Sequence, residues 1–104
     1  MIVIDITYHR SGRTESLYNV YYMDIDYTFD ERGVMTAEYP AISGYNEQGE
    51  VRTYVAYPSD IVTIRTDNES DDEAESFMVN SYYDGNKKLY ARLEFIVSMN
   101  NNQT

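Results

Sequence analysis

Alternation of apolar and polar residues with a period of two is the feature that most constrains the fold of this chain. Near its start, Ile2, Ile4 and Ile6 fall on one face of an extended segment, while Asp5 and Thr7 fall on the other. This is the period of a half-buried strand, because successive side chains of a strand point to opposite faces. Since no segment shows a sustained helical spacing of apolar residues, the sequence predicts a chain built almost entirely of strands.

Residues 17–29 continue the alternation over a length that is unusual for one strand. The odd positions Leu17, Tyr21, Met23, Ile25, Tyr27 and Phe29 are apolar or aromatic. The even positions include Asp24 and Asp26. The content of Tyr, Val, Ile and Thr favours a strand over a helix. We expect a bulge near residues 21–22, where the strand would otherwise be too long to stay regular.

Short polar turns separate the alternating segments. Gly12, Gly33 and Gly49 stand in three of them, beside polar residues that favour turns. Glycine accepts a positive φ at such positions, and Asp or Asn bonds to the backbone of the turn. The segments between these turns predict further strands at 34–39, 50–57 and 61–66, with a weaker one at 41–45. Pro40 is expected to end a strand or to place it at an edge, because proline cannot donate to a ladder.

The C-terminal third predicts one more hairpin. Asp84 and Gly85 form a dipeptide that is preferred in tight turns, and they separate residues 76–83 from residues 89–99. Every second position in the latter segment is apolar. We therefore expect the most amphipathic strand of the chain over 89–99, followed by a disordered tail over 100–104.

These elements fit a single β domain over residues 1–99. A chain of 104 residues buries on the order of 65% of its unfolded surface, which provides a sufficient core. Six or seven strands joined by short hairpins, with little or no helix, predict an all-β fold, either a small antiparallel β-sandwich or an open barrel.

The charge balance limits the class of partner. The chain carries 18 acidic and 8 basic residues, for a net charge of −10. Such a field repels polyphosphates, so direct binding of nucleic acid is disfavoured. The same field attracts basic surfaces and accelerates encounter with them. The expected partner is therefore a basic protein whose own ligand is an anion.

Other features of the composition point to a folded protein of the cytoplasm. The 12 tyrosines and 3 phenylalanines supply aromatic content that disordered acidic tails lack. The chain has no cysteine, which excludes disulfides, thiolate metal sites and cysteine nucleophiles, and fits a reducing compartment. The N-terminal apolar run is too short for a signal peptide, and no stretch approaches the ~20 apolar residues of a membrane span.

The densest charge lies in residues 67–75, with the sequence DNESDDEAE. A run of this kind is typical of a solvated loop, and its functional alternative is a surface that attracts something basic. An EF-hand loop that began at Asp67 would require Gly at its sixth position and Glu at its twelfth, where this chain has Asp72 and Met78. We therefore expect no metal or other cofactor. The carboxylates of this run are Asp67, Glu69, Asp71, Asp72, Glu73 and Glu75.

A second acidic group has a more defined geometry. Asp24 and Asp26 fall on the same face of the strand predicted over 17–29, ~6.8 Å apart at the two-residue repeat of a strand, and Asp30 continues the row. Successive phosphates of a nucleic-acid strand have a comparable spacing, so such a row fits a Lys/Arg groove built for a nucleic-acid backbone. The alternative is that these aspartates only aid solubility and discourage aggregation.

Catalytic residues are sparse, and most tyrosines are expected to pack across strands. The single His9 lies beside Arg10 with no nucleophile motif near it, so we expect no enzyme activity. A minority of the tyrosines are candidate interface anchors, because Tyr combines a large area with a polar tip. These candidates are Tyr82, Tyr83 and Tyr90 near the last predicted hairpin, and Tyr54 or Tyr57 on a middle strand.

In composition and size the chain resembles the small acidic inhibitors that phages make against host defences, including anti-CRISPR proteins and other DNA mimics. The resemblance agrees with our leading hypothesis, an acidic binding protein without catalysis that covers the basic groove of a CRISPR-Cas-type effector or nuclease. A phage-encoded inhibitor would act in the host cell cytoplasm. The predicted contact residues are Asp24, Asp26, Asp30, Asp67, Glu69, Asp71, Asp72, Glu73, Glu75, Tyr82 and Tyr83.

Two other functions fit the same composition. One is a structural or assembly β-module, such as a virion component or a homo-oligomer whose tyrosine face packs against copies of itself. The other is an immunity or antitoxin protein for a basic toxin, which would have the same electrostatics and differ only in its partner.

Overall fold

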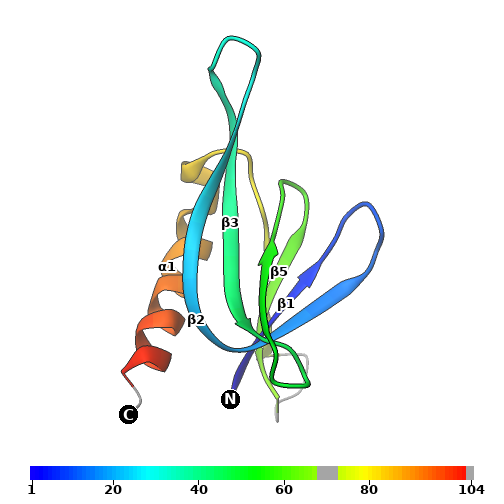
Figure 1. Cartoon of the computed structure of the whole chain (residues 1–104), viewed down its shortest axis with the longest axis vertical. Coiled ribbons are helices and arrows are strands. Elements are labelled where there is room, and N and C mark those ends of the chain that lie inside the picture. Colours follow the sequence, from blue (N-terminus) through cyan, green and yellow to red (C-terminus); the bar gives the residue numbers. More distant parts are fainter. Residues whose placement is uncertain (68–72, 103–104) are drawn as a thin grey trace.

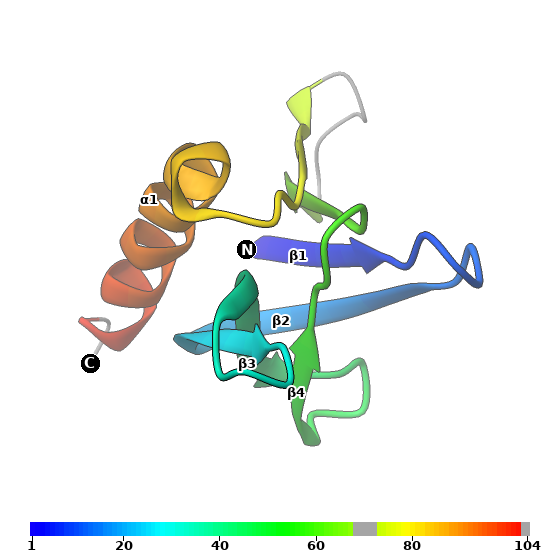
Figure 2. The ribbon, with the colours of Figure 1, turned by 90° about the horizontal axis from the view of Figure 1, so that it is seen from above.

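The computed structural model describes residues 1–67 and 73–102, which form six strands and one helix (Figure 1). The strands make one antiparallel sheet with the order β4-β3-β2-β1-β5-β6. Seen from above, α1 lies on one side of this sheet (Figure 2). The elements are β1 (Ile2–Thr7), β2 (Thr14–Phe29), β3 (Met35–Tyr45), β4 (Val51–Val55), β5 (Ile61–Thr66), β6 (Glu75–Met78) and α1 (Tyr83–Asn101).

The predominance of antiparallel strands is confirmed, and two finer expectations change. The sheet is open, because β4 and β6 are edge strands that do not pair with each other, and a barrel or sandwich is not confirmed. The expectation of little or no helix is wrong, since α1 spans 19 residues. A helix therefore covers the sheet where a second sheet was expected.

The long strand β2 is bent in the middle, as the predicted bulge implies. Its first half pairs with β1 up to Val3↔Tyr18, and its second half pairs with β3 from Tyr22↔Ser43 onward. The register shifts between Tyr18 and Tyr22, where Asn19 has a φ of 49°. Figure 1 shows the resulting change of direction in β2.

Close packing at the bend requires glycine in the neighbouring strand. A Cβ added to Gly44 would lie 2.9 Å from the Tyr18 carbonyl oxygen and 3.2 Å from Val20 Cα. Any larger side chain would therefore push the two strands apart. The predicted turns around Gly12, Gly33 and Gly49 are also confirmed, with φ values of 72°, 78° and 78°.

Pro40 was expected to end a strand or to place it at an edge. It does not end β3, which continues to Tyr45, and β3 lies between β4 and β2 in the sheet. The last β3–β4 pair is Ala41↔Val55, and beyond it the Ala56 N–H donates to the Pro40 carbonyl over 3.0 Å. The N and C=O of one strand residue point toward the same neighbour. The donor that Pro40 lacks would therefore point past the last β4 pair, so its absence breaks no ladder bond.

The predicted hairpin at Asp84 and Gly85 and the predicted strand over 89–99 are also wrong, because both belong to α1. Residues 87–94, KKLYARLE, are mostly strong helix formers. Apolar residues at alternate positions also include pairs four residues apart, which share one face of a helix. The residues of the predicted strand that pack against the sheet are Leu89, Leu93 and Ile96, while Phe95 is 61% exposed.

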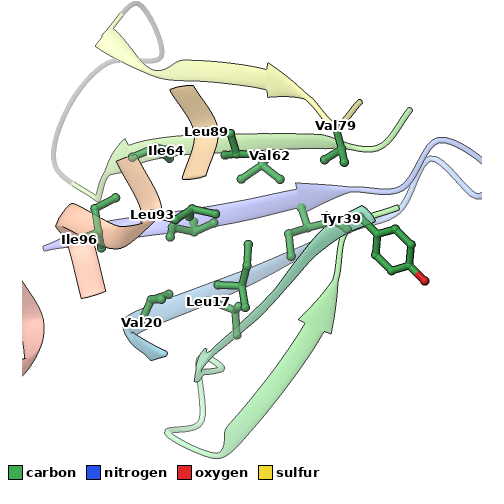
Figure 3. Close-up of a cluster of buried hydrophobic side chains, with 13 residues drawn as sticks. Leu17, Val20, Tyr39, Val62, Ile64, Val79, Leu89, Leu93 and Ile96 are labelled. Atoms are coloured by element: carbon green, nitrogen blue, oxygen red, sulfur yellow. The ribbon is translucent and has the colours of Figure 1, made fainter. Parts of the chain in front are cut away.

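The core lies between α1 and the face of the sheet that α1 covers (Figure 3). Leu93 and Ile96 point from the helix toward this face. Complete burial of such aliphatic side chains contributes about 1.5–3 kcal/mol each. The sheet residues of the core include Ile4, Ile6, Leu17, Val62 and Ile64.

The end of α1 is held by the bend in β2. The side-chain amides of Asn100 and Asn101 donate to the carbonyls of Val20 and Tyr21 over 2.8 and 3.0 Å. These carbonyls belong to bulge residues for which no ladder pair is formed. Residues 100 and 101 were expected in a disordered tail and instead belong to the helix; the part of that tail at 103–104 lies outside the described residues.

The other face of the sheet carries many polar groups, and no helix or strand of residues 1–67 and 73–102 forms a second layer over it. Hydroxyl groups pair across neighbouring strands, as between Thr7 and Thr14 at 3.0 Å. The Arg65 guanidinium bonds to the Asp5 carboxylate at 2.6 Å on the same face, and this contact raises the pKa of Arg65. In the described part of the chain, no helix combines the length and apolarity needed to cross a membrane.

Candidate interaction surface

The second half of β2 and most of β3 pair with each other over residues 22–43 (the β2–β3 arm). At its base, β4 also pairs with β3 up to Ala41, opposite Asp24, and beyond this pair the arm has two strands. Its tip stands beyond the rest of the molecule along the longest axis (Figure 1). At the tip, Asp30 accepts the backbone N–H groups of Arg32 and Val34 over 2.8 and 3.0 Å. Asp30 was predicted to continue the acidic row. In the structure, one of its carboxylate oxygens accepts both of these hydrogen bonds and stabilises the turn.

The acidic pair lies on the face of the arm that α1 does not cover. Asp24 and Asp26 pair across the arm with Ala41 and Tyr39, so both point to the same face. One Asp24 oxygen accepts the N–H of Ile25 at 2.8 Å. Neither carboxylate of this pair, hereafter the acidic pair, forms an ion pair with another described residue.

Tyr39 connects the acidic pair to the buried part of the arm. It is 6% exposed and stacks against Tyr57 with ring centroids 4.8 Å apart. Burial, and then the proximity of Tyr57 and Asp26, raise the pKa of Tyr39. Tyr57, one of the candidate anchors, is therefore engaged by Tyr39 although half of its surface is exposed.

Two described residues of the acidic run, Asp67 and Glu75, lie away from this surface. Asp67 binds the N-terminal amine at 3.4 Å, beside the start of β1 and at the opposite end of the molecule from the tip (Figure 1). Glu75 forms an ion pair with Arg92 of α1 at 2.9 Å. Glu73 is exposed, and the predicted contact residues Glu69, Asp71 and Asp72 lie outside the described residues.

The opposite face of the arm carries exposed aromatic rings that the sequence analysis did not single out. Tyr27 and Phe29 are 50% and 60% exposed, with ring centroids 6.4 Å apart. Tyr83, at the start of α1, is 49% exposed and lies 5.7 Å from the ring of Tyr90. We call Tyr27, Phe29 and Tyr83 the aromatic face.

The aromatic face is exposed because the arm extends past the start of the helix. The odd positions of β2 were predicted to share one inward face, and near the bend they do, since Met23 packs against the core. Toward the tip, Tyr27 and Phe29 leave half or more of their surface exposed. The signal in the sequence was the position of Phe29, directly before the turn that begins at Asp30.

A buried polar network joins the arm to the helix. Glu38, paired across the arm with Tyr27, is 7% exposed and accepts the Tyr90 hydroxyl at 3.3 Å. Burial raises the pKa of Tyr90 to about 12; a hydrogen bond from Asn86 opposes the shift and Glu38 adds to it. Tyr90 is 2% exposed, so this candidate anchor is a core residue.

Segment 79–82 is tied into the same network. The side chain of Asn86 bonds to the backbone N–H and C=O of Asn80 over 2.7 and 2.9 Å. The Glu38 N–H donates to the Ser81 carbonyl over 2.8 Å. These bonds fix the chain ahead of the candidate anchors Tyr82 and Tyr83, and Tyr82 is 55% exposed as the N-cap residue of α1.

The remaining candidates from the sequence lie elsewhere. His9 is exposed, and its backbone N–H donates to Asp60 at 2.8 Å. The other Asp60 oxygen accepts the N–H of Tyr57 at 2.8 Å, beside a surface hollow of about 500 Å³. Within residues 1–67 and 73–102, no group of three or more His, Asp or Glu side chains could hold a metal ion.

Comparisons of the chain with protein-family models, curated proteins and solved structures found no match. Function is therefore inferred from the residues of the β2–β3 arm and from the charge of the chain.

Proposed function

We propose that the protein is an acidic binding protein without catalysis, which inhibits a nucleic-acid-binding protein by placing its β2–β3 arm in the basic groove of that partner. The observation that carries the proposal is the acidic pair, held at strand spacing on a projecting arm. Asp24 and Asp26 form no ion pair with described residues, so both charges are available to a partner.

The shape of the arm supports insertion into a groove. Two antiparallel strands lie ~4.8 Å apart, so a two-stranded ribbon is a narrow element. Asp24 pairs with Ala41 and Asp26 pairs with Tyr39 in the ladder between β2 and β3. This ladder fixes the backbone at both aspartates and therefore the face to which their side chains point. A fixed pair of carboxylates loses less conformational entropy on binding Lys or Arg than the same charges on a loose segment.

The charge of the arm supports a basic partner. Besides the buried Glu38, residues 22–43 include Asp24, Asp26, Asp30 and Glu31, with a single basic residue at the tip. Carboxylates accept two parallel hydrogen bonds from arginine in the same way as phosphates do. A groove that binds a nucleic-acid backbone through arginine therefore has the donors that this face requires.

Self-assembly through the same face is disfavoured. In a symmetric dimer the same patch of both copies meets, so the interface would bring two acidic pairs close to each other. Like charges brought together in this way repel each other. An immunity protein for a basic toxin would use the same face of the arm, and only the identity of the partner separates the two functions.

Photo-crosslinking from the arm tests the proposal. A photoreactive amino acid replaces Thr28, beside the acidic pair, and in a control protein it replaces Glu47, in the turn between β3 and β4. In cells of the source organism, the arm position is expected to capture a nucleic-acid-binding protein that the control position does not capture. Capture only of proteins that do not bind nucleic acid, or equal capture from both positions, contradicts the proposal.

A further inference from the structure

We propose that the aromatic face binds arginine side chains of the basic partner, so that the partner contacts the arm on both faces. This inference rests on the proposed function and specifies the chemistry of its partner. It assigns a binding role to Tyr27, Phe29 and Tyr83 in addition to the acidic pair.

The rings form a row of two pairs between the tip and the start of α1. Phe29 contacts Tyr27 with ring centroids 6.4 Å apart, and Tyr83 contacts the buried Tyr90 with ring centroids 5.7 Å apart. Glu38 connects the two pairs, because it pairs across the arm with Tyr27 and accepts the Tyr90 hydroxyl.

Exposed rings of this kind fit a cationic ligand better than a purely apolar one. The faces of aromatic rings attract cations, and the planar guanidinium of arginine also stacks on them. The net charge of −10 attracts a basic partner to the whole molecule. Asp84 follows Tyr83 directly, and Asp30 and Glu31 follow Phe29, so carboxylates border the row at both ends.

The two faces of the arm contact different parts of the partner. Tyr27 pairs with Glu38, which bonds to the helix residue Tyr90, whereas Asp24 and Asp26 point to the face that α1 does not cover. A flat basic patch cannot reach both faces of a ribbon at once. We therefore infer a partner with a cleft, with arginine on the wall that meets the aromatic face.

Two labelled peptides, ten arginines and ten lysines, test this inference by fluorescence anisotropy at one ionic strength. The wild type is expected to bind the arginine peptide about five- to tenfold more tightly than the lysine peptide, because lysine stacks poorly on rings. The double variant Y27L/F29L retains apolar area and removes the ring faces. It is expected to lose the preference for the arginine peptide. The control variant F95L, which changes an exposed ring on α1, is expected to retain this preference.

The variant with D24N and D26N separates this inference from the proposed function. It is expected to bind both peptides more weakly and still to prefer the arginine peptide. An unchanged affinity for both peptides would count against the acidic pair and leave the aromatic face supported. Equal binding of the two peptides by the wild type, or an unchanged ratio in the Y27L/F29L variant, overturns the inference.

Light scattering and thermal melts complete the test. The wild type is expected to be a monomer, and a dimer that Y27L and F29L convert to a monomer would overturn the inference, because a second copy would then occupy the aromatic face. A Tm for the leucine variant close to that of the wild type shows that it is folded. If it is not folded, the single substitution F29L at the tip replaces it, with the same expected loss of preference.

Discussion

Tyr90 is the residue through which the helix holds the arm, since its hydroxyl donates to the buried carboxylate of Glu38 at 3.3 Å. The substitution Y90F removes this donor. The buried carboxylate of Glu38 then loses its hydrogen bond from Tyr90. We expect the free energy of unfolding at pH 7 to fall by about 1–3 kcal/mol, the usual effect of leaving a buried polar group unsatisfied. Urea unfolding measures this change, and Y83F, which keeps the ring on the surface, is the control.

The pH dependence of stability gives a second test of Tyr90. Its pKa is about 12 in the folded protein, against an ordinary value of 10.0. Below pH 10 both states keep the proton and stability is unaffected. Between pH 10 and pH 12 only the unfolded state releases it, so this residue lowers the stability by about 2–3 kcal/mol as the pH rises.

The Y90F variant is therefore expected to lose less stability than the wild type over that interval. Tyr8, Tyr39 and Tyr54 also have raised pKa values, so they weaken both proteins in the same direction. The measured quantity is the difference between the two unfolding curves at pH 9.5 and pH 11.5. Parallel curves would show that Tyr90 ionises as easily in the folded state as in the unfolded state.

At the scale of elements, the bend of β2 depends on a close approach of two strands. A Cβ on Gly44 would meet the backbone of Tyr18 and Val20, at 2.9 and 3.2 Å. Backbone atoms cannot move aside without opening the bend. We expect G44A to destabilise the fold by about 1–3 kcal/mol, the usual cost of overpacking. An unchanged denaturation midpoint would mean that the bend adapts freely.

The end of α1 makes a separate contribution to the same bend. Double substitution N100A/N101A removes the hydrogen bonds to the carbonyls of Val20 and Tyr21. We expect a loss of about 1–3 kcal/mol, at about 0.5–1.5 kcal/mol for each bond. The control is N102A, at a position where the bond to Ser98 comes from the backbone N–H. Equal stability of the two variants would contradict this role.

Local patterns were sufficient to predict strands β1, β2, β4 and β5, the bulge in β2 and the three glycine turns. Each depends on neighbours along the chain, such as a glycine that accepts positive φ. The helix α1 was not predictable in the same way, because Leu89 and Leu93 suit either a strand with period two or a helix with four-residue spacing. The contact of α1 with the sheet decides between them, and a single sequence does not contain that contact.

The candidate site was predictable in part for the same reason. Asp24 and Asp26 share a face because strand geometry places alternate residues together, which the sequence shows directly. The exposure of Tyr27 and Phe29 depends on where α1 begins relative to the arm, and this is a tertiary property. The acidic run of residues 67–75 has the denser charge, yet its described members Asp67 and Glu75 have partners elsewhere in the fold.

At the scale of the whole molecule, a net charge of −10 would attract any basic protein, wherever the contact is made. Removal of charge from any surface therefore weakens long-range attraction. The position of the charges matters only for the contact itself, since screening limits exposed charges to a range of about 8 Å at physiological salt. Variants of equal net charge separate the two effects.

Glu47 and Glu94 are suitable sites for a control variant with the same change of net charge as D24N/D26N. Both glutamates are exposed, and neither forms an ion pair with a described residue. Glu47 lies in the β3–β4 turn and Glu94 on α1, away from the acidic pair. The variants D24N/D26N and E47Q/E94Q therefore change the net charge equally. They differ in the part of the surface from which the two charges are removed.

The most direct measurement is displacement of a labelled duplex from the nucleic-acid-binding protein captured by the arm, titrated with the wild type and with these two variants. The wild type and E47Q/E94Q are predicted to displace the duplex at similar concentrations, and D24N/D26N is predicted to require at least about tenfold more, because each lost contact between charged groups costs about 1.5–3 kcal/mol. Equal displacement by the two variants, or no displacement by the wild type, would contradict the account of the arm as an inhibitor of a basic groove.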